Sequence, residues 1–447
     1  MPQAIGPRAG WHDRRVDPPS GGPATTSSAE PLPEYDPRLP AFRASRHAVY
    51  RRLRQEAPAS FSERAGAWII TRYEDVVAIL LDTARFSADN SIGIAPFETM
   101  HDDVRAALDR GYPRFPGIIE MDPPTHTAYR SVVNLAFTPG RVAALEPSIR
   151  RIANELIDDL RGRTDADFVK VFGDPLPIRV IGEILGVPPR DTATVQELSD
   201  SFRMLEAGTI GLLPVDEQVR IAERFVEFQR YVAAMITDRR AHPCDDLVSV
   251  ICQARLDDGR LLDLDELVST VIHLLFAGQE TTTRLLAGCV HLLLRERRLW
   301  DELVADPTLA AAAVEEGLRL DPPVTYHLRR ARVPVTIDGV TIPAGGAVHL
   351  VFASANRDEA AFPEPDAFDL HRPNASRHLG FGRGIHFCVG APVGRMEGRI
   401  GLQVLAARLP TLALVEPGEP LREPHVMLSG IASLPVRWNE VDPRPAG

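Results

Sequence analysis

The run HLGFGRGIHFCVGAPVGR, residues 378–395, decides how this 447-residue chain is interpreted. Cys388 lies at its centre, in a glycine-rich and electropositive loop that leads into a helical pattern. Gly382, Gly384 and Gly390 permit backbone conformations in which amide N–H groups turn toward the sulfur. Those amides and the start of the following helix would stabilise a thiolate. Three chemical roles compete for Cys388: half of a disulfide, a zinc or iron–sulfur ligand, or a lone thiolate bound to a larger group.

The other cysteines narrow this choice. The chain has only Cys244, Cys252 and Cys289 besides Cys388, and no two form a CxxC or Cys/His pattern. A zinc finger or an iron–sulfur cluster is therefore disfavoured. Sparse, unpaired cysteines are typical of a reducing cytosol. A lone thiolate suits haem iron, because its electron donation promotes O–O cleavage. The loop by itself also fits a structural turn around a buried cysteine, and that alternative stays open at this point.

Composition excludes several classes of partner. The formal net charge of −11 argues against a general nucleic-acid or anionic-membrane surface. The pair Arg14-Arg15 is followed by a polar stretch where a signal peptide would need an apolar core. No run approaches the roughly 18 apolar residues that span a bilayer. We expect a cytoplasmic monomer that binds neither nucleic acid nor membrane.

The organisation of the chain is mostly helical. Residues 1–38 are rich in Pro, Gly, Ser and Thr and predict a disordered tail. Residues 67–73 (AWIITRY) predict a strand that runs into a helix, and Asp338-Gly339 between alternating apolar residues predicts a hairpin. The segment GAVHLVFAS, residues 346–354, predicts a further strand. Few, clustered strands among many helices fit neither a doubly wound sheet nor a barrel, so the predicted class is mainly α with small β-sheets.

One helical pattern is exceptionally long, from about Asp263 to Arg295. At 1.5 Å per residue it would extend about 50 Å, enough to cross the molecule. Its middle nevertheless carries Gly278, Glu280 and three threonines (281–283), which are poor choices for a helix interior. Either the glycine serves packing and the threonines bond back to the helix, or the helix breaks locally around a ligand.

Several motifs in a fixed order then carry a resemblance. FGRGIHFCVG (381–390) resembles the haem-binding loop of the cytochrome P450 family. The family's other segments are HTAYR (126–130), AGQETT (277–282), EGLR (316–319) and FDLHR (368–372), and they precede the loop in the family's order. EGLR alone would be a weak signal, but the ordered set is very specific. The sequence departs from the family at GAPVGR, where the family usually has GAxLAR.

The resemblance covers residues 39–447 and implies a single catalytic domain with the cytochrome P450 fold. It implies a haem b cofactor between the long central helix and the Cys loop. Cys388 would bind the iron and Phe381 would pack against its sulfur. The positions that match the family's propionate-binding side chains are His126, Arg130, Arg329 and His386. Ala277 and Gly278 would adjoin the haem, with Gly278 leaving room for O₂.

The resemblance also implies a proton path and a structural network. Glu280 would pass protons inward, and Thr281 would hydrogen-bond the bound oxygen. Glu316 and Arg319 lie three apart on one helix face. With Arg372 they would form a structural ion-pair network and take no part in catalysis.

The expected activity is monooxygenation: insertion of one oxygen atom from O₂ into a C–H bond, by hydroxylation or epoxidation. The expected substrate is a mid-sized, largely apolar small molecule of bacterial secondary metabolism. A haem-thiolate peroxygenase or an oxidative coupling enzyme is the alternative, and the intact Glu280-Thr281 pair argues against it. The same pair argues against a haem sensor without turnover.

Electrons must come from a partner, because no reductase, flavin or ferredoxin motif is fused to the chain. Residues 371–400 hold five arginines against a single acid, Glu397. This basic rim predicts docking of an acidic 2Fe-2S or 3Fe-4S ferredoxin, which works with its reductase. Arginines that bind the propionates or internal acids would account for about half of the charge.

Substrate contacts are expected at six positions and in two variable loops, residues 88–118 and 204–216. By helix geometry His273 lies one turn before Ala277, on the same side. It is either a polar anchor for a substrate oxygen or a histidine satisfied by a neighbouring helix carbonyl. The other expected positions match segments that contact substrate in the family: Val324, Thr325, Tyr326, Met427 and Leu428.

Overall fold

The computed structural model describes residues 32, 34–92, 100–206, 213–416, 418–423 and 425–444, except for the side chain of residue 206. Most of the expected tail, and parts of both variable loops, lie outside the described residues. Tyr35 and Asp36 precede the expected domain boundary at residue 39, yet both are buried. The Tyr35 ring packs edge-on against Phe42 and His349. The packed chain therefore starts a few residues earlier than the composition indicates.

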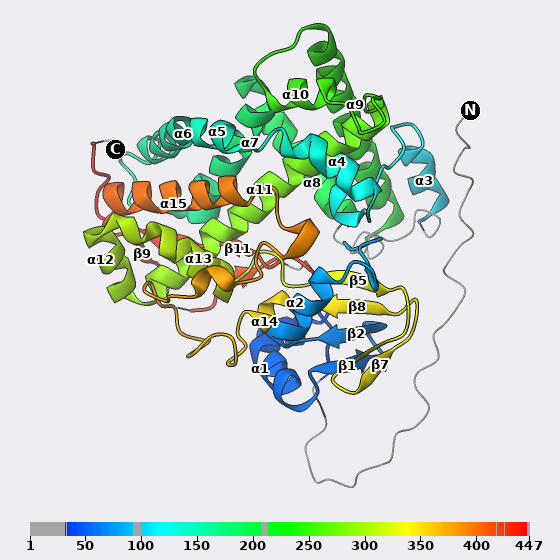
Figure 1. Ribbon diagram of the computed structural model, residues 1–447. Coiled ribbons are helices and arrows are strands. Elements are labelled where there is room, and N and C mark those ends of the chain that lie inside the picture. The colour runs from blue at the N-terminus through cyan, green and yellow to red at the C-terminus, as the bar shows by residue number, and fades with distance from the viewer. Residues whose placement is uncertain are drawn as a thin grey trace.

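The molecule is mainly helical with small sheets, as the sequence predicts (Figure 1). Its α-helices are α1 Pro40–Glu56, α2 Tyr73–Leu81, α3 Asp102–Leu108, α4 Thr125–Asn134, α5 Pro139–Ala144, α6 Glu146–Asp158, α7 Pro175–Leu185, α8 Thr192–Glu206, α9 Val215–Ala241, α10 Leu247–Gln253, α11 Leu264–Arg295, α12 Arg297–Ala305, α13 Ala310–Leu320, α14 Phe352–Ala355 and α15 Ala391–Arg408. No helix within the described ranges has both the length and the apolar character to cross a membrane.

The long helix α11 lies at the centre of the helical part, packed against α7, α9, α13 and α15 (Figure 1). It remains helical through Gly278, so the structure supports the packing alternative over a local break. A Cβ atom on Gly278 would lie 2.9 Å from the Ile181 side chain of α7, so the glycine permits close approach of the two helices. The Thr281 hydroxyl donates to the Ala277 carbonyl at 2.7 Å.

The strands form one larger sheet and three small ones, and the larger sheet lies beside the helical part (Figure 1). Its order is β1-β2-β8-β5-β3, with β2 parallel to β8 and the other neighbours antiparallel. The strands are β1 Ala59–Ser62, β2 Ala67–Ile70, β3 Phe86–Ser87, β4 Asp165–Asp167, β5 His327–Ala331, β6 Val335–Ile337, β7 Val340–Ile342, β8 Ala347–Leu350, β9 Ala413–Leu414, β10 Leu421–Arg422, β11 Ile431–Ser433 and β12 Pro435–Arg437.

The predicted hairpin is confirmed. β6 and β7 pair antiparallel around Asp338 and Gly339, which have φ values of 47° and 77°. Positive φ at both central residues is the geometry of a two-residue turn that matches the strand twist. The strand predicted within residues 67–73 is β2, which leads into α2, and the one predicted within residues 346–354 is β8.

Candidate active site

The Cys388 loop is built as its glycines predict. Gly382 and Gly384 have φ values of 69° and 72°, in the left-handed region that other residues resist. A Cβ atom on Gly384 would also lie 2.8 Å from the Leu80 carbonyl. The Cys388 amide donates to the Phe381 carbonyl at 2.9 Å, which closes the loop just before α15.

The sulfur of Cys388 is surrounded by donors but buried. Burial raises the pKa of the Cys388 thiol, while the amides of Gly390 and Ala391 and the Arg130 guanidinium act to lower it. Burial is the largest of these effects, so the protein alone keeps the thiol protonated. A metal cation at the sulfur would reverse that balance.

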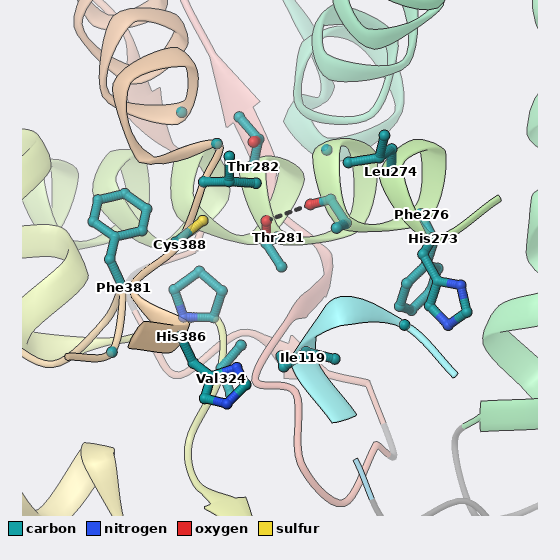
Figure 2. A pocket seen from close by; sticks show the side chains of 18 of the residues that line it. Ile119, His273, Leu274, Phe276, Thr281, Thr282, Val324, Phe381, His386 and Cys388 are labelled. Carbon is teal, nitrogen blue, oxygen red and sulfur yellow. Dashed lines mark hydrogen bonds between the residues drawn. The ribbon is translucent and has the colours of Figure 1, made fainter. Parts of the chain in front are cut away.

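Cys388 opens into an internal cavity of about 290 Å³ beneath α11. Figure 2 shows the Cys388 sulfur between Phe381, on the left, and Thr281 of that helix, with Thr282 above. His273 and Phe276 lie toward the other end of the cavity (Figure 2). The loop, the central helix and the segment around Val324 therefore enclose one space, as the resemblance implies.

Basic side chains gather at one rim of this cavity. Arg130, Arg329 and His386 line the cavity, whereas His126 does not. The His126 ring packs behind this rim, 4.4 Å from the ring of His386. Arg130 donates to the Phe387 carbonyl and Arg329 to the Leu328 carbonyl, each at 2.7 Å. Neither arginine pairs with a carboxylate within the described part of the chain.

The electrostatics of this rim favour an anionic ligand. Burial lowers the pKa of Arg329 to about 10. Burial, followed by the charges of Arg329 and the other basic neighbours, lowers the pKa of His386 to about 3. The buried Nε2 of His126 has no hydrogen-bond partner among the described residues. Buried cations without counter-ions are costly, and two carboxylates at this rim would remove the cost. The residues present therefore fit haem, with its sulfur-bound iron and two propionates.

The expected acid–alcohol pair lies on two faces of α11. Thr281 lines the cavity, whereas Glu280 does not. The Glu280 carboxylate is buried and paired with Arg284, and it also lies 3.4 Å from the Arg203 Nε. Arg284 in turn pairs with Glu423. Glu280 is therefore held in an ion-pair network that runs away from the cavity.

Ala277 and Gly278 both line the cavity, as expected. A Cβ atom on Gly278 would point at the Ile181 side chain, which lines the same cavity. The space that the glycine provides is filled by α7.

Three of the other five positions at which substrate contact is expected line the cavity. Val324, Met427 and Leu428 line the cavity, and Val324 pairs with Leu428 in an isolated antiparallel bridge. Thr325 and Tyr326 do not line it. The Thr325 hydroxyl donates to the Met427 carbonyl at 2.7 Å, and Tyr326 stacks on His349 with ring centres 4.6 Å apart. Both side chains therefore contact other parts of the protein and hold the cavity wall against the sheet.

His273 lines the cavity, but its own helix holds the ring. Its Nδ1 lies 2.7 Å from the Ser269 carbonyl, and a Cβ on Gly117 would lie 2.9 Å from the ring. Phe202 packs edge-on against it at 5.2 Å. These contacts match the alternative in which a helix carbonyl satisfies the histidine.

Glu397 and His425 also line the cavity, although no motif predicts them there. Burial raises the pKa of Glu397 well above its ordinary value, which disfavours a negative charge on this carboxyl. Its place nine residues after Cys388, on the helix that the loop leads into, could have indicated proximity. His425 lies two residues before Met427 and carries no motif.

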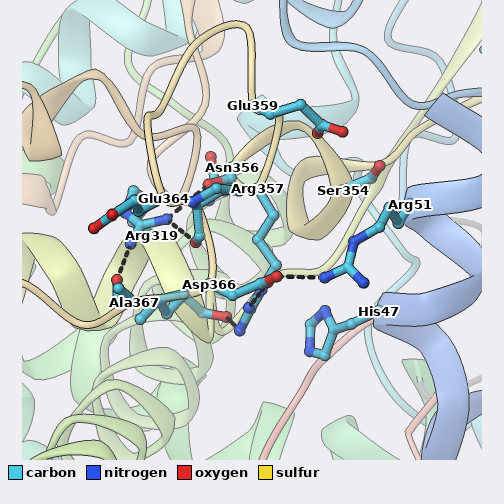
Figure 3. Close-up of polar contacts among 12 residues, drawn as sticks. His47, Arg51, Arg319, Ser354, Asn356, Arg357, Glu359, Glu364, Asp366 and Ala367 are labelled. Carbon is cyan, nitrogen blue, oxygen red and sulfur yellow. Dashed lines mark hydrogen bonds and ion pairs between the residues drawn. The ribbon is translucent and has the colours of Figure 1, made fainter. Parts of the chain in front are cut away.

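The structural network lies apart from the cavity. Glu316 and Arg319 are fully buried and paired at 2.7 Å, and Arg372 lies 3.0 Å from the same Glu316 oxygen. Arg319 also donates to the Ala367 carbonyl, as Figure 3 shows. In the same region Asp366 accepts hydrogen bonds from Arg51 and Arg357 (Figure 3).

The five arginines of residues 371–400 divide into two groups. Arg372, Arg395 and Arg399 pair with Glu316, Glu315 and Glu146. Arg377 is exposed and lies 3.7 Å from the exposed Glu74. Arg383 is half-buried, lines the cavity and donates to the Arg377 carbonyl at 2.9 Å. About half of the predicted rim is thus occupied internally.

Comparison with known proteins agrees with this architecture. A family model for cytochrome P450 matches residues 215–408. The cytochrome P450 monooxygenase PikC of Streptomyces venezuelae is 37% identical over 404 residues, covering 89% of this chain and 92% of PikC. The mycinamicin IV hydroxylase/epoxidase of Micromonospora griseorubida is 40% identical over 377 residues, covering 83% and 89%. Among solved structures, cytochrome P450 CYP109Q5 from Chondromyces apiculatus matches with a TM-score of 0.80 and 34% identity, covering 91% of this chain and 98% of that one.

Proposed function

Because this chain belongs to the cytochrome P450 family and is a haem b monooxygenase, we propose that it hydroxylates or epoxidises a mid-sized, oxygen-bearing and largely apolar molecule with electrons from a ferredoxin. The observation that carries the proposal is one cavity that brings together the Cys388 sulfur, Thr281 and two arginines that pair with no carboxylate among the described residues, the buried Arg329 and the half-buried Arg130. When bound there, haem supplies the activation of O₂ and the oxidising power for the C–H bond.

Each group at the site then has a role. Cys388 binds the iron, with its negative charge supported by the amides of Gly390 and Ala391. Arg130 and Arg329 hold the propionates, since a guanidinium fork matches a carboxylate. His126 and His386 complete this rim.

Proton delivery falls to Glu280 and Thr281. The Thr281 hydroxyl lies at the cavity wall, and Glu280 connects through the half-buried Arg203 toward solvent. For Glu280 to deliver a proton, its carboxyl must leave Arg284, which keeps Glu423 as a counter-ion. Arg284 remains paired with Glu423 while the Glu280 carboxyl moves, so the movement leaves no buried charge without a partner.

The substrate class follows from the apolar wall and from the relatives. The relatives include enzymes named for erythromycin C-12 hydroxylation, mycinamicin IV hydroxylation or epoxidation and steroid C26 oxidation. A bacterial secondary metabolite of this kind fits a cavity whose wall carries few polar groups.

The redox partner is proposed to dock over the Cys388 loop. The exposed Arg377 and the half-buried Arg383 lie there beside two exposed apolar side chains, Leu81 and Ile385. A Cβ on Gly384 would lie 3.4 Å from Leu81, so these groups adjoin. A basic patch with an apolar centre suits an acidic 2Fe-2S or 3Fe-4S ferredoxin. All four cysteines are free, which suits the reducing cytoplasm where we expect the enzyme to act.

The proposal is tested by turnover under ¹⁸O₂. The purified enzyme is supplied with a 2Fe-2S ferredoxin and its reductase, and a panel of polyketides, terpenoids and steroids is screened by mass spectrometry. One labelled oxygen atom in the product, with the other in water, is the expected result. Product that forms only with added hydrogen peroxide would overturn the proposal in favour of a peroxygenase.

A further inference from the structure

We propose that His425 positions the substrate by donating its Nε2–H to an acceptor oxygen of the substrate. The proposal rests on the proposed function, because it assigns a recognition element within the same cavity. It predicts a substrate that carries a carbonyl or ether oxygen on an otherwise apolar frame.

The first argument is the tautomer of His425. Its Nδ1 accepts hydrogen bonds from the backbone amides of Met427 at 3.2 Å and Leu428 at 3.0 Å. An amide N–H can only donate, so Nδ1 carries no proton. In a neutral imidazole the proton then lies on Nε2, which becomes a donor.

The second argument is the charge of the ring. Burial, followed by the positive charges of Arg284 and Arg203, lowers the pKa of His425 to about 3. The ring is therefore neutral at physiological pH. It offers one hydrogen-bond donor whose direction is set by the two amides.

The third argument is what the neighbouring polar groups do. The Thr270 hydroxyl donates to the Glu266 carbonyl and the Thr281 hydroxyl to the Ala277 carbonyl, each at 2.7 Å. His273 donates from Nδ1 to Ser269 at 2.7 Å. The protons of these three groups on α11 are therefore directed at their own helix.

The other polar side chains that line the cavity face α15 or belong to the basic rim. Thr282 faces α15, where a Cβ on Gly394 would lie 3.9 Å from its hydroxyl oxygen. His327, Arg329 and His386 belong to the basic rim. Among the described residues, the Nε2 of His425 makes no hydrogen bond, although the residue lines the cavity. A ligand oxygen is the partner that would satisfy it.

Two substitutions separate this role from a structural one. His425→Asn keeps an acceptor for the two amides, because the amide oxygen of the new side chain takes the place of Nδ1, but that side chain is too short to place a donor at Nε2. His425→Gln places an N–H near the position of Nε2 but gives up the acceptor at Nδ1. The His425→Asn variant should therefore keep the local turn, and the His425→Gln variant should keep the donor.

The probes are cyclododecanone and methylidenecyclododecane, which have nearly the same shape but differ in the acceptor oxygen. Their Kd values are measured on the ferric, haem-loaded protein from the substrate-induced absorbance change. Within one variant, the ratio of the two Kd values removes the effect of that variant's stability, because both probes bind the same protein. Comparing this ratio between variants removes the difference in hydration of the two probes, because the probes are the same. We expect the preference for the ketone to fall about 5- to 10-fold in His425→Asn, the value of one net hydrogen bond. His425→Gln should retain most of the preference with a lower unfolding temperature.

An unchanged ratio in a folded His425→Asn variant would overturn the proposal, as would a ketone that fails to bind the wild-type protein. A variant with an unchanged ratio but more peroxide released per electron would assign His425 to proton delivery instead. The proposed function has a separate readout. A wild-type protein without the CO spectrum of a thiolate-bound haem would refute that function, whereas the ratio of the two Kd values tests only the role of His425.

Discussion

The Glu280 carboxylate lies against the Arg284 guanidinium one helical turn further along α11, while Thr281, the residue between the pair and next to Glu280, faces the cavity. Glu423 contacts the same arginine from the C-terminal part of the chain. The helix thus presents an acid to a buried ionic network and an alcohol to the site. Movement of one carboxyl is enough to link the two.

Glu280→Gln should slow turnover by about 10² to 10⁴-fold, because a placed acid that delivers protons contributes roughly that factor. Steady-state rates with saturating ferredoxin measure it, and a larger solvent isotope effect should accompany the loss. Glu419→Gln is the control, since it removes an exposed acid that pairs with Arg295 outside this network and should leave the isotope effect unchanged. Equal isotope effects in the wild-type and Glu280→Gln enzymes would exclude Glu280 from proton delivery.

Thr281→Ala should retain haem and substrate but divert electrons to peroxide and water. The hydroxyl at the cavity wall is lost, so the protons of the reaction are no longer ordered there. The measurement is peroxide formed per NADPH consumed. Thr283→Ala is the control, because that hydroxyl contacts the Gly173 carbonyl at 3.2 Å on the opposite side. Normal coupling in Thr281→Ala would contradict the assigned role.

Cys388→Ala should abolish the absorption band of the reduced, CO-bound protein that is characteristic of thiolate-bound haem. The circular dichroism spectrum should keep most of its helical signal, because Cys388 lies in the loop before α15 and outside the helices. Cys289→Ala makes a control: that thiol is buried on α11, where burial raises its pKa and keeps it protonated. A thiolate spectrum that survives in Cys388→Ala would remove Cys388 from the iron.

Arg377→Glu should weaken ferredoxin-supported activity, and the defect should shrink as salt rises. Exposed charges are screened within about 10 Å at 0.1 M ionic strength. Arg377 is half exposed, and its nearest acid, Glu74, is itself exposed. Arg220→Glu on α9, also exposed, should have no such effect. A loss of activity that does not depend on salt would indicate misfolding.

Arg329→Leu should stabilise the haem-free protein and weaken haem retention. Burial lowers the pKa of Arg329 to about 10 from an ordinary value of 12.5. Between these pH values the unfolded chain binds more protons than the folded one, so stability rises with pH across that window. Below pH 10 the charged form costs about 3 kcal/mol.

Urea unfolding of the haem-free protein at pH 7 should therefore show a gain of up to about 3 kcal/mol in Arg329→Leu. Transfer of haem to apomyoglobin should be faster than from the wild type. Arg330→Leu is the control, because that neighbour is exposed and bonds only to the Gly345 carbonyl. If the haem-free Arg329→Leu protein were less stable than the wild type, Arg329 would have a structural role in the haem-free fold and would not be held there for a haem propionate.

The sequence by itself determined the features that depend on local order along the chain. The glycines around Cys388, the length of α11, the Asp338-Gly339 turn and the ordered motifs each express a constraint within one short segment. Steric limits on φ and helical periodicity act over a few residues, so they can be recognised without the rest of the fold.

Only the tertiary structure decided which side chains reach the cavity. Tyr326 turns to His349, the Gly278 space is filled by Ile181, and His273 is held by Ser269. His425 has its donor directed by two amides that no motif marks. The physical reason is that Tyr326 and Gly278 depend on a neighbour that packs from another segment, whereas His273 and His425 depend on which hydrogen bonds the folded backbone offers to the ring. Neither the packing neighbours nor the available hydrogen bonds are known before the chain is folded.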